Sequence, residues 1–565
     1  MAVATLGVSL GVAVSGCEAT SSSTPQAPTV DAELSAQTRL AGTLRGSEGQ
    51  SMAVAEIHVA IDGQAQVVEV GAEGRFELSA PTGTWVELRL TGVDHAEHTV
   101  GFLADGGDHR ELDFVLGTYP RPAADEVGPV VAVGRFDSAG RISIPLSRRD
   151  DGTWATTLDP SKHGLEAAHS FYYQLSNITS VGRTINGTQA DRYAYDGGGD
   201  YISIVDLPGG QPLELVWDPR AMPKPGSASR IVFASPGSRA ARSAEIREAV
   251  EREREEAAAE VRARLAKGGD RDELRRRAGL TLREELARAS EQVDDPWLQA
   301  LWWVAWAAEL PDEPSAAERE AAREQVAALL DRLDPQDPAW SLDPWALPTA
   351  LRYVDRPQYF TLAASEHPNP EVGAALWVSA LVEADHAGDF DRARAAKQAL
   401  DQPRFASSEV QRLAAHFDPD RRTAPGKPVP EFRLQAIDGA ELTPESLRGR
   451  VYVLDFWATW CGPCLAEMPN LHAAHEALGE VELISISLDH DPALVAEFRR
   501  ERWPMPWTHA VPDTQAHARL TADFALAGIP TMVLVGRDGT ILASSPSLDA
   551  SSLAAIAGDR LGADG

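Results

Sequence analysis

Two cysteines separated by two residues stand between a strand-like run and a helix-like run. The strand-like run is 451–457, the cysteines are Cys461 and Cys464, and the helix-like run is 465–478. A continuous apolar run of this length is typical of a strand buried on both faces of a parallel sheet. Cys461 is therefore expected at a helix N-terminus, where unpaired N–H groups and the helix dipole favour a thiolate. Because a thiolate is the nucleophile of disulfide exchange, the pattern predicts a redox-active dithiol.

The third cysteine, Cys17, follows an apolar segment at the start of the sequence. Residues 1–16 carry no charge and are too short to span a bilayer comfortably. They end in Val14-Ser15-Gly16-Cys17, which resembles a bacterial lipobox, the motif that is cut before a cysteine that then carries lipid. Residues 17–36 are expected to form a flexible tether. We therefore expect a lipoprotein-type signal at 1–16, lipidation of Cys17, and a location in the cell envelope, facing the periplasm or the exterior.

The absence of Lys or Arg before this apolar segment departs from that pattern. The alternatives are an ordinary N-terminus or a cleaved secretory signal with a chance cysteine. The formal net charge of −32 repels phosphate backbones and anionic lipid, so no nucleic-acid partner is expected and membrane contact is expected through the lipid anchor only. Residues 18–460 contain no cysteine, which excludes a disulfide-rich scaffold and leaves the later pair without competing partners.

The N-terminal third of the chain shows alternating apolar and polar residues between turn signals. This pattern predicts a small β-sandwich at 37–118 and a second β-rich domain of sandwich type at 120–236. Gly74-Arg75-Phe76-Glu77-Leu78, followed by Pro81-Thr82-Gly83, resembles the carboxypeptidase-regulatory-like domains, which implies a spacer or interaction module. The segment Asp196-Gly197-Gly198-Gly199-Asp200 lacks the further carboxylates of a calcium loop and is interpreted as a turn.

Residues 240–420 are predicted to form a central α-helical region, and residues 427–565 an α/β domain with a mixed sheet. Helices of the central region are expected at 240–264, 297–310, 315–333, 371–385 and 388–400. In the last domain, strands are expected at 451–457, 481–488, 531–535 and 541–545, and helices at 464–478, 492–502, 516–525 and 549–560. The fold class is thus multidomain, with two β-sandwich domains, a helical region and an α/β domain.

The last domain carries two motifs in a fixed order. The first is Asp455-Phe456-Trp457-Ala458-Thr459-Trp460-Cys461-Gly462-Pro463-Cys464, followed by Glu467, and the second is Gly528-Ile529-Pro530-Thr531. With these motifs, residues 427–565 resemble the thioredoxin superfamily, and within it the TlpA/ResA-like membrane-tethered proteins. The resemblance implies a thioredoxin fold and an extracytoplasmic thiol–disulfide oxidoreductase that needs no cofactor. It also implies a protein disulfide or thiol substrate, a membrane electron donor, and cytochrome c maturation as the first candidate process.

The residue types and their positions also indicate the chemistry expected at this site. Cys461 should be partly exposed and attack the substrate, whereas Cys464, one turn inside the helix, should be more buried and resolve the mixed disulfide. Gly462 is expected to let the turn close tightly, and Pro463 to fix the first helical turn. Asp455 lies inside an apolar strand, so its pKa should be raised by burial.

The remaining roles follow from the resemblance alone. It implies that Asp455 relays the proton of the resolving thiol and that Glu467 tunes the thiols. It implies a cis peptide bond before Pro530, which turns the backbone of Ile529 toward a substrate strand. Substrate contacts are expected at Trp460, Gly462, Pro463, Ile529 and Thr531. No metal site is expected, because His472 and His475 do not form a zinc motif and are interpreted as helix-surface residues.

Two other functions fit parts of the sequence. The first is a peroxidase of the peroxiredoxin class, which shares the fold but requires T-x-x-C, whereas only one residue separates Thr459 from Cys461. The second is a cell-envelope binding protein whose redox module is accessory and whose task resides in residues 37–420. Net oxidation or isomerisation of substrates is a third direction for the same dithiol, and the substrate, the donor and the redox potential stay open.

Overall fold

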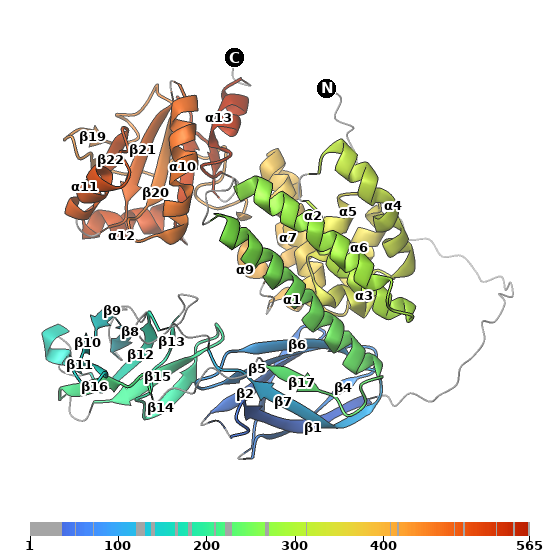
Figure 1. The fold of residues 1–565 in the computed structure, drawn as a ribbon. Coiled ribbons are helices and arrows are strands. Elements are labelled where there is room, and N and C mark those ends of the chain that lie inside the picture. The colour runs from blue at the N-terminus through green and yellow to red at the C-terminus, as the bar shows by residue number, and fades with distance from the viewer. Residues whose placement is uncertain are drawn as a thin grey trace.

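The computed structural model describes residues 37–562, apart from short internal gaps. These gaps are 51, 53, 72, 120–129, 137–141, 164–167, 179–183, 208–210, 221–228, 266–270, 312–313, 407, 409, 415–416, 480, 490–491, 527 and 546–547. The predicted signal at 1–16, the tether at 17–36 and Cys17 lie outside the described residues. The structure comprises two β regions, a helical region and a C-terminal α/β domain, so the multidomain prediction is confirmed (Figure 1).

The first β region has two four-stranded sheets. Its strands are β1 (Gln37–Gly46), β2 (Ala55–Ile61), β3 (Gln64–Glu69), β4 (Arg75–Pro81), β5 (Trp85–Gly92), β6 (His98–Leu103), β7 (Asp108–Leu116) and β17 (Arg230–Val232). The sheet orders are β17-β7-β1-β4 and β3-β2-β5-β6. Strand β4 alternates strictly between exposed and buried residues, and its buried side chains Phe76 and Leu78 join Leu88 and Phe102 of the other sheet in one core.

The second β region lies between β7 and β17 in the sequence. Its strands are β8 (Val131–Phe136), β9 (Ile142–Pro145), β10 (Ser147–Arg148), β11 (Trp154–Leu158), β12 (Ser170–Ser176), β13 (Ile185–Asn186), β14 (Arg192–Tyr195), β15 (Tyr201–Asp206) and β16 (Leu213–Trp217), with the 3₁₀ helix η1 (Pro160–His163). They form sheets β10-β11-β16 and β14-β15-β12-β8-β9, with β13 on β12. The sequence placed 230–232 in this region, but β17 pairs antiparallel with β7, so the chain returns to the first region.

The helical region packs on the first β region. Its helices are α1 (Arg239–Leu265), α2 (Arg271–Ser290), α3 (Pro296–Ala308), α4 (Ala316–Arg332), η3 (Pro338–Leu342), α5 (Ala346–Leu351), α6 (Pro357–Glu366), α7 (Pro370–Ala387), α8 (Phe390–Leu400), η4 (Pro403–Phe405) and α9 (Gln411–Ala414). The first turns of helix α1 pack on β6, and the rest of the helix runs away from the sheet (Figure 1). Ser243 of α1 accepts a hydrogen bond from the Leu103 amide (2.9 Å), and Trp85 of β5 belongs to the core of the helices.

Five helices of this region were predicted from the sequence within about two residues, which is ordinary scatter for helix ends. Helices α2, α5, α6 and α9 were not predicted. The α2 segment is dominated by Arg and Glu and has little apolar periodicity, and it becomes helical where Leu282 and Leu286 pack into the common core. Among the helices that the structure describes, none is long and apolar enough to cross a membrane.

The C-terminal domain has a five-stranded sheet of order β22-β21-β20-β23-β24. Its elements are β18 (Leu434–Gln435), β19 (Glu441–Leu442), β20 (Tyr452–Trp457), α10 (Gly462–Ala477), β21 (Glu482–Ser487), α11 (Pro492–Glu501), β22 (Thr508–Ala510), α12 (Thr514–Asp523), β23 (Thr531–Val535), β24 (Ile541–Ser544) and α13 (Leu553–Gly562). Strand β20 is parallel to β21 and antiparallel to β23, so the predicted mixed sheet is confirmed. Strand β22 was not predicted.

A buried ion pair joins this domain to the helical region. Arg421, in the connecting segment, forms two hydrogen bonds with the Asp385 carboxylate of α7, at 2.9 and 3.1 Å. The same guanidinium lies 3.4 Å from Ser544 Oγ of β24. The side chains of Arg421 and Asp385 are only 7% and 1% exposed. One arginine thus holds the last strand of the sheet against the helices.

Candidate active site

The central strand β20 determines which side chains face the cysteine-bearing helix. All six of its residues are buried, and alternate residues point to opposite faces of the sheet. Tyr452, Leu454 and Phe456 belong to the core on one face, whereas Val453 and Trp457 belong to the core on the other, which also contains both cysteines and Met468 of α10. Asp455 alternates in step with Val453 and Trp457 and so lies on the same face of the strand, which puts its carboxyl on the α10 side.

The two cysteines occupy the start of α10 and form a disulfide. Cys461 is the N-cap residue, and Cys464 lies in the first turn, with a Cα–Cα distance of 5.3 Å. The Cys464 amide donates to Cys461 Sγ (3.1 Å), a bond that would stabilise a thiolate on Cys461 after reduction. We expected Cys461 to be partly exposed, but it is 4% exposed and Cys464 is 3% exposed. In the disulfide form both cysteines belong to the buried core, and Cys461 Sγ lies against the Ile529 carbonyl.

The loop before β23 faces the disulfide. The Ile529–Pro530 peptide bond is cis, as predicted. The Ile529 carbonyl oxygen lies 3.6 Å from Cys461 Sγ, although the two residues are far apart in sequence. Thr531 starts β23, pairs with Phe456 and donates its hydroxyl to the Gly528 carbonyl (2.8 Å). The two sequence motifs thus meet at one site.

The surface around the disulfide is formed by Trp460, Gly462 and Pro463. Trp460 is 67% exposed, which gives a large apolar contact area beside a buried disulfide. Pro463 stands in the first turn of α10, as predicted. The expectation for Gly462 is not supported, because its φ is not positive and a Cβ atom there would meet no atom within 4 Å. The turn would therefore accommodate a side chain at position 462.

An anchor that sequence reasoning missed holds the loop between β20 and α10. The Asp489 carboxylate accepts hydrogen bonds from the Thr459 amide (2.9 Å) and the Thr459 hydroxyl (2.7 Å). It also accepts one from the Ser487 hydroxyl (2.6 Å). Asp489 follows β21, next to β20, and no local pattern in the sequence pairs it with Thr459. The Thr459 hydroxyl thus serves to fix the loop that presents Trp460.

Asp455 is a buried acid held by one side-chain partner. It is 2% exposed, and Ser485 Oγ donates to its Oδ2 atom (2.7 Å) across the β20–β21 pair. Burial raises the pKa of Asp455 to about 7, the Ser485 hydrogen bond opposes this rise, and the negative charge of Glu467 adds to it. Glu467 is half-buried on α10, one turn after Cys464. The predicted raised pKa is confirmed, and the proton-relay role stays a prediction.

Aromatic and histidine side chains pack behind this acid. Trp507 Nε1 donates to Ser485 Oγ (2.9 Å), and its ring centroid lies 4.9 Å from those of His472 and His475. His509 stacks on Trp507 at 5.9 Å. We expected His472 and His475 to be helix-surface residues, but the ring of each contacts Trp507. Within the described residues, no group of three His, Cys, Asp or Glu side chains is arranged to hold a metal ion.

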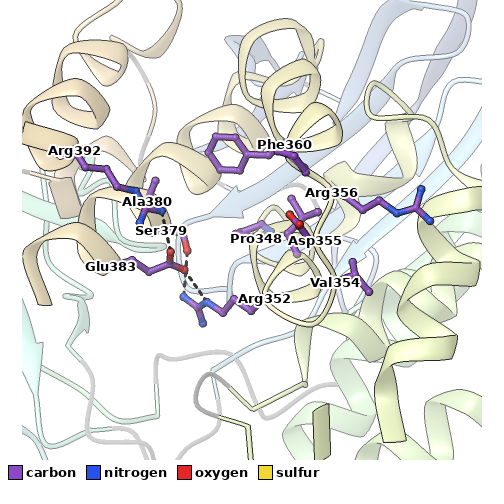
Figure 2. Close-up of a pocket in the computed structure, with 12 residues that line it drawn as sticks. Pro348, Arg352, Val354, Asp355, Arg356, Phe360, Ser379, Ala380, Glu383 and Arg392 are labelled. Atoms are coloured by element: carbon purple, nitrogen blue, oxygen red, sulfur yellow. Dashed lines mark hydrogen bonds and ion pairs between the residues drawn. The ribbon is translucent and has the colours of Figure 1, made fainter. Parts of the chain in front are cut away.

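A hollow of about 260 Å³ lies in the helical region, and the cysteines do not line it. Figure 2 shows Arg352 and Arg392 directed at the Glu383 carboxylate between them, at 3.3 and 3.4 Å, and Arg352 also donates to Ser379 Oγ (3.1 Å). Phe360 lines the apolar wall of the hollow. The acids Asp355 and Glu383 line the same hollow as Arg352, Arg356 and Arg392.

A family of known proteins matches within the C-terminal domain. Residues 425–544 match the model of the AhpC/TSA family. The chain is 26% identical over 119 residues to the thiol-disulfide oxidoreductase ResA of Bacillus cereus (strain ZK / E33L), covering 21% of this chain and 66% of that protein. It is 37% identical over 91 residues to ResA of Oceanobacillus iheyensis, covering 14% of this chain and 47% of that protein.

Among solved structures, a putative thiol:disulfide interchange protein DsbE from Chlorobium tepidum is 26% identical, with a TM-score of 0.22. The match covers 24% of this chain and 97% of that one. The chain spans just under two thirds of the length of the first curated relatives it matches. The matches to the family and to these relatives support the predicted resemblance of the C-terminal domain to the thioredoxin superfamily and to the ResA-like proteins within it.

Proposed function

We propose that this protein is a thiol–disulfide oxidoreductase that exchanges disulfides through Cys461 and Cys464. The observation that carries the proposal is the disulfide at the start of α10, with Cys461 Sγ 3.6 Å from the Ile529 carbonyl beside the cis Pro530 bond. A substrate strand could pair with the backbone of this loop while its disulfide meets Cys461. The exposed Trp460 supplies apolar contact at the same place.

The reduced dithiol would act in two steps. The Cys461 thiolate attacks one sulfur of the substrate disulfide, so a mixed disulfide forms and the other substrate sulfur leaves as a thiolate that takes up a proton. Cys464 then gives its proton to the Asp455 carboxylate, and its thiolate attacks Cys461 Sγ. The second substrate sulfur leaves as a thiolate and takes up a proton, so the substrate carries two thiols and the protein keeps the Cys461–Cys464 disulfide. Glu467 would tune these proton transfers from the same helix.

The setting of this reaction is also a proposal. We infer an extracytoplasmic enzyme, anchored by lipid at Cys17 and supplied with electrons by a membrane donor, that reduces protein disulfides. In an oxidising compartment the dithiol would stay oxidised without such a donor, so the proposed location requires one. Cytochrome c maturation is the process that the resemblance to the tethered proteins favours. We further propose that the two β regions are sandwich domains that act as spacers or interaction modules.

The test is a trapping experiment with the full chain. A Cys464→Ala variant should accumulate mixed disulfides through Cys461, because the resolving thiol is absent, and should lose at least 100-fold in turnover of a protein disulfide. Cys461→Ala is the matched control, since it removes the attacking sulfur and should trap nothing. Mass spectrometry of the trapped species would identify the substrates. Equal trapping by both variants, or by neither, would contradict the proposal.

Peroxide consumption distinguishes the peroxidase alternative from disulfide exchange. The Thr459 hydroxyl donates a hydrogen bond to Asp489, and Cys461 forms a disulfide with Cys464. Both observations favour disulfide exchange. Rapid peroxide consumption by a Cys464→Ser variant would instead favour the peroxidase.

A binding protein with an accessory redox module is a second candidate function, and the arginine-lined hollow beside Glu383 is the observation that favours it. If a chain with both Cys461 and Cys464 changed to Ala kept its full biological function, the binding role would be favoured over the redox role.

A further inference from the structure

The hydrogen bonds around Asp455 run in one direction. An indole N–H can only donate, so Trp507 must give its proton to Ser485 Oγ. The Ser485 hydroxyl hydrogen is then free to point at the other neighbour of that oxygen, which is Asp455 Oδ2. Ser485 is fully buried and Trp507 is 8% exposed, so both bonds lie away from bulk solvent. The arrangement places a donor on the Asp455 carboxylate from the strand next to it.

We propose that Ser485, held by Trp507, is a positioning residue that keeps the Asp455 carboxyl ionised and aimed at the α10 side during the exchange reaction. This inference rests on the proposed function, in which Asp455 accepts the Cys464 proton. Neither Ser485 nor Trp507 is expected to touch the substrate or the sulfurs. Their effect reaches the reaction through the acid.

The physical reason is a balance between burial and one hydrogen bond. An acid can accept a proton only while it is ionised, and burial works against the ionised form. The Ser485 hydroxyl donates to the carboxylate and stabilises it, because hydrogen bonds to a charged acceptor are stronger than neutral ones. Without this donor, Asp455 would stay protonated to higher pH, and Cys464 would lose the group that receives its proton.

The other titratable side chains near this chain of bonds do not explain the same effect. Glu467 of α10 carries a negative charge that favours protonation of Asp455 and so acts against Ser485. His472 and His475 of α10 and His509 of β22 contact the Trp507 ring. Burial lowers the pKa of His472, and it lowers that of His509 to about 3, so His509 is neutral where Asp455 titrates.

The resolving step can be measured by itself. The reduced full chain, with Cys17 changed to Ala, is mixed in a stopped-flow instrument with Ellman's reagent, and the second release of thionitrobenzoate reports the attack of Cys464 on Cys461. In the parent chain, the rate should rise with pH with a midpoint near the Asp455 pKa of about 7. Ser485→Ala should shift this midpoint upward by about one to two pH units, and slow the step about tenfold or more below it.

Conservative variants separate positioning from a loss of packing. Ser485→Thr keeps the hydroxyl and should restore the midpoint. Trp507→Phe keeps a ring against the histidines but removes the N–H, and should shift the midpoint upward by less than Ser485→Ala does. Its control is Trp503→Phe, which changes another tryptophan on His472 and should not move the midpoint.

A spectroscopic readout follows the acid itself. The infrared band of protonated Asp455, identified by its loss in Asp455→Asn, should persist to higher pH in Ser485→Ala. An unchanged midpoint and an unchanged band in folded Ser485→Ala would overturn the inference while leaving the exchange reaction intact. If the parent chain released no second thionitrobenzoate at any pH, the proposed function itself would fail. The two outcomes are therefore distinguishable.

Discussion

At the scale of the residue, Asp455 is the side chain of the site in which burial and ionisation oppose each other. A carboxyl group inside a strand that is otherwise apolar costs folding free energy whenever it is ionised. The structure offsets part of that cost with one hydroxyl, from Ser485, and adds to it with the charge of Glu467. An acid of this kind exchanges protons near neutral pH, where an exposed aspartate would stay ionised. A costly residue in the core is what the proposed proton transfer requires.

The raised pKa of Asp455 predicts how the stability of the folded chain depends on pH. The pKa of Asp455 is about 7 in the folded chain, against an ordinary value of 3.8. Between these values the folded state keeps a proton that the unfolded state releases, so the stability contributed by this group falls as pH rises from about 4 to about 7. Asp455→Asn removes the effect, and it should stabilise the domain at pH 8 by on the order of 4 kcal/mol and by little at pH 4.

Hydrogen exchange of the β20 amides, compared between variant and native chain at each pH, measures this difference. Asp438→Asn changes an exposed acid of the same domain, and should stay within about 0.5 kcal/mol of the native chain at both pH values. A stabilisation by Asp455→Asn that is equal at pH 4 and pH 8 would contradict the assignment.

At the scale of the element, the junction of α1 with β6 shows how a helix that is charged along most of its length is held. Only the first turns of α1 are buried, up to Val250. There, Ser243 accepts from the Leu103 amide at 2.9 Å and donates to the Ala240 carbonyl at 3.0 Å. The Ala240 amide donates to Asp105 Oδ2 at 3.0 Å. These polar contacts fix the first turns of α1 on the sheet, and the rest of the helix follows.

Ser243→Ala should loosen this junction. It leaves the buried Leu103 amide without its acceptor, which should cost about 1–3 kcal/mol. Faster hydrogen exchange in β6 and in the first turns of α1 is the expected measurement. Ser365→Ala is the control, because that exposed hydroxyl serves only the Thr361 carbonyl of its own helix, and its loss should cost less than about 0.5 kcal/mol. Equal effects of the two variants would show that the Ser243 bond contributes nothing to the junction.

At the scale of the whole molecule, the Arg421–Asp385 pair connects the C-terminal domain to the helices. The pair is buried and bidentate, and its neighbour Arg422 forms an exposed pair with Asp523 of α12. Buried and exposed ion pairs differ in consequence, because removing one partner of a buried pair leaves an unpaired charge in the interior. Two adjacent arginines thus provide a matched comparison within one segment.

Arg421→Met should cost about 3–5 kcal/mol at this junction and make the segment around 418–427 a site of rapid cleavage by thermolysin. Arg422→Met should cost less than about 1 kcal/mol and resist cleavage like the native chain. The double variant Arg421→Met, Asp385→Leu removes the stranded charge and should recover most of the resistance. If Arg421→Met proved as resistant as Arg422→Met, the pair would have no role in the junction.

The sequence by itself determined the features that depend on residues close together in the chain. The Gly-Ile-Pro-Thr motif predicted the cis bond before Pro530 only through its resemblance to a known family. The apolar run at 451–457 and the spacing of Cys461 and Cys464 predicted the central strand and the helix start. They did so because hydrophobic periodicity and helix-end chemistry are local. The central helices with strong apolar patterns were predicted for the same reason.

Only the tertiary structure decided the features that depend on which distant segments lie side by side. Strand register placed Ser485 opposite Asp455, and the next connection brought Trp507 behind it. The return of β17 to β7 and the Arg421–Asp385 pair are of the same kind. No local pattern encodes these partners, because they are chosen by the packing of elements that the sequence alone does not place relative to one another. The fold therefore supplies the surroundings of a dithiol that the sequence already contains.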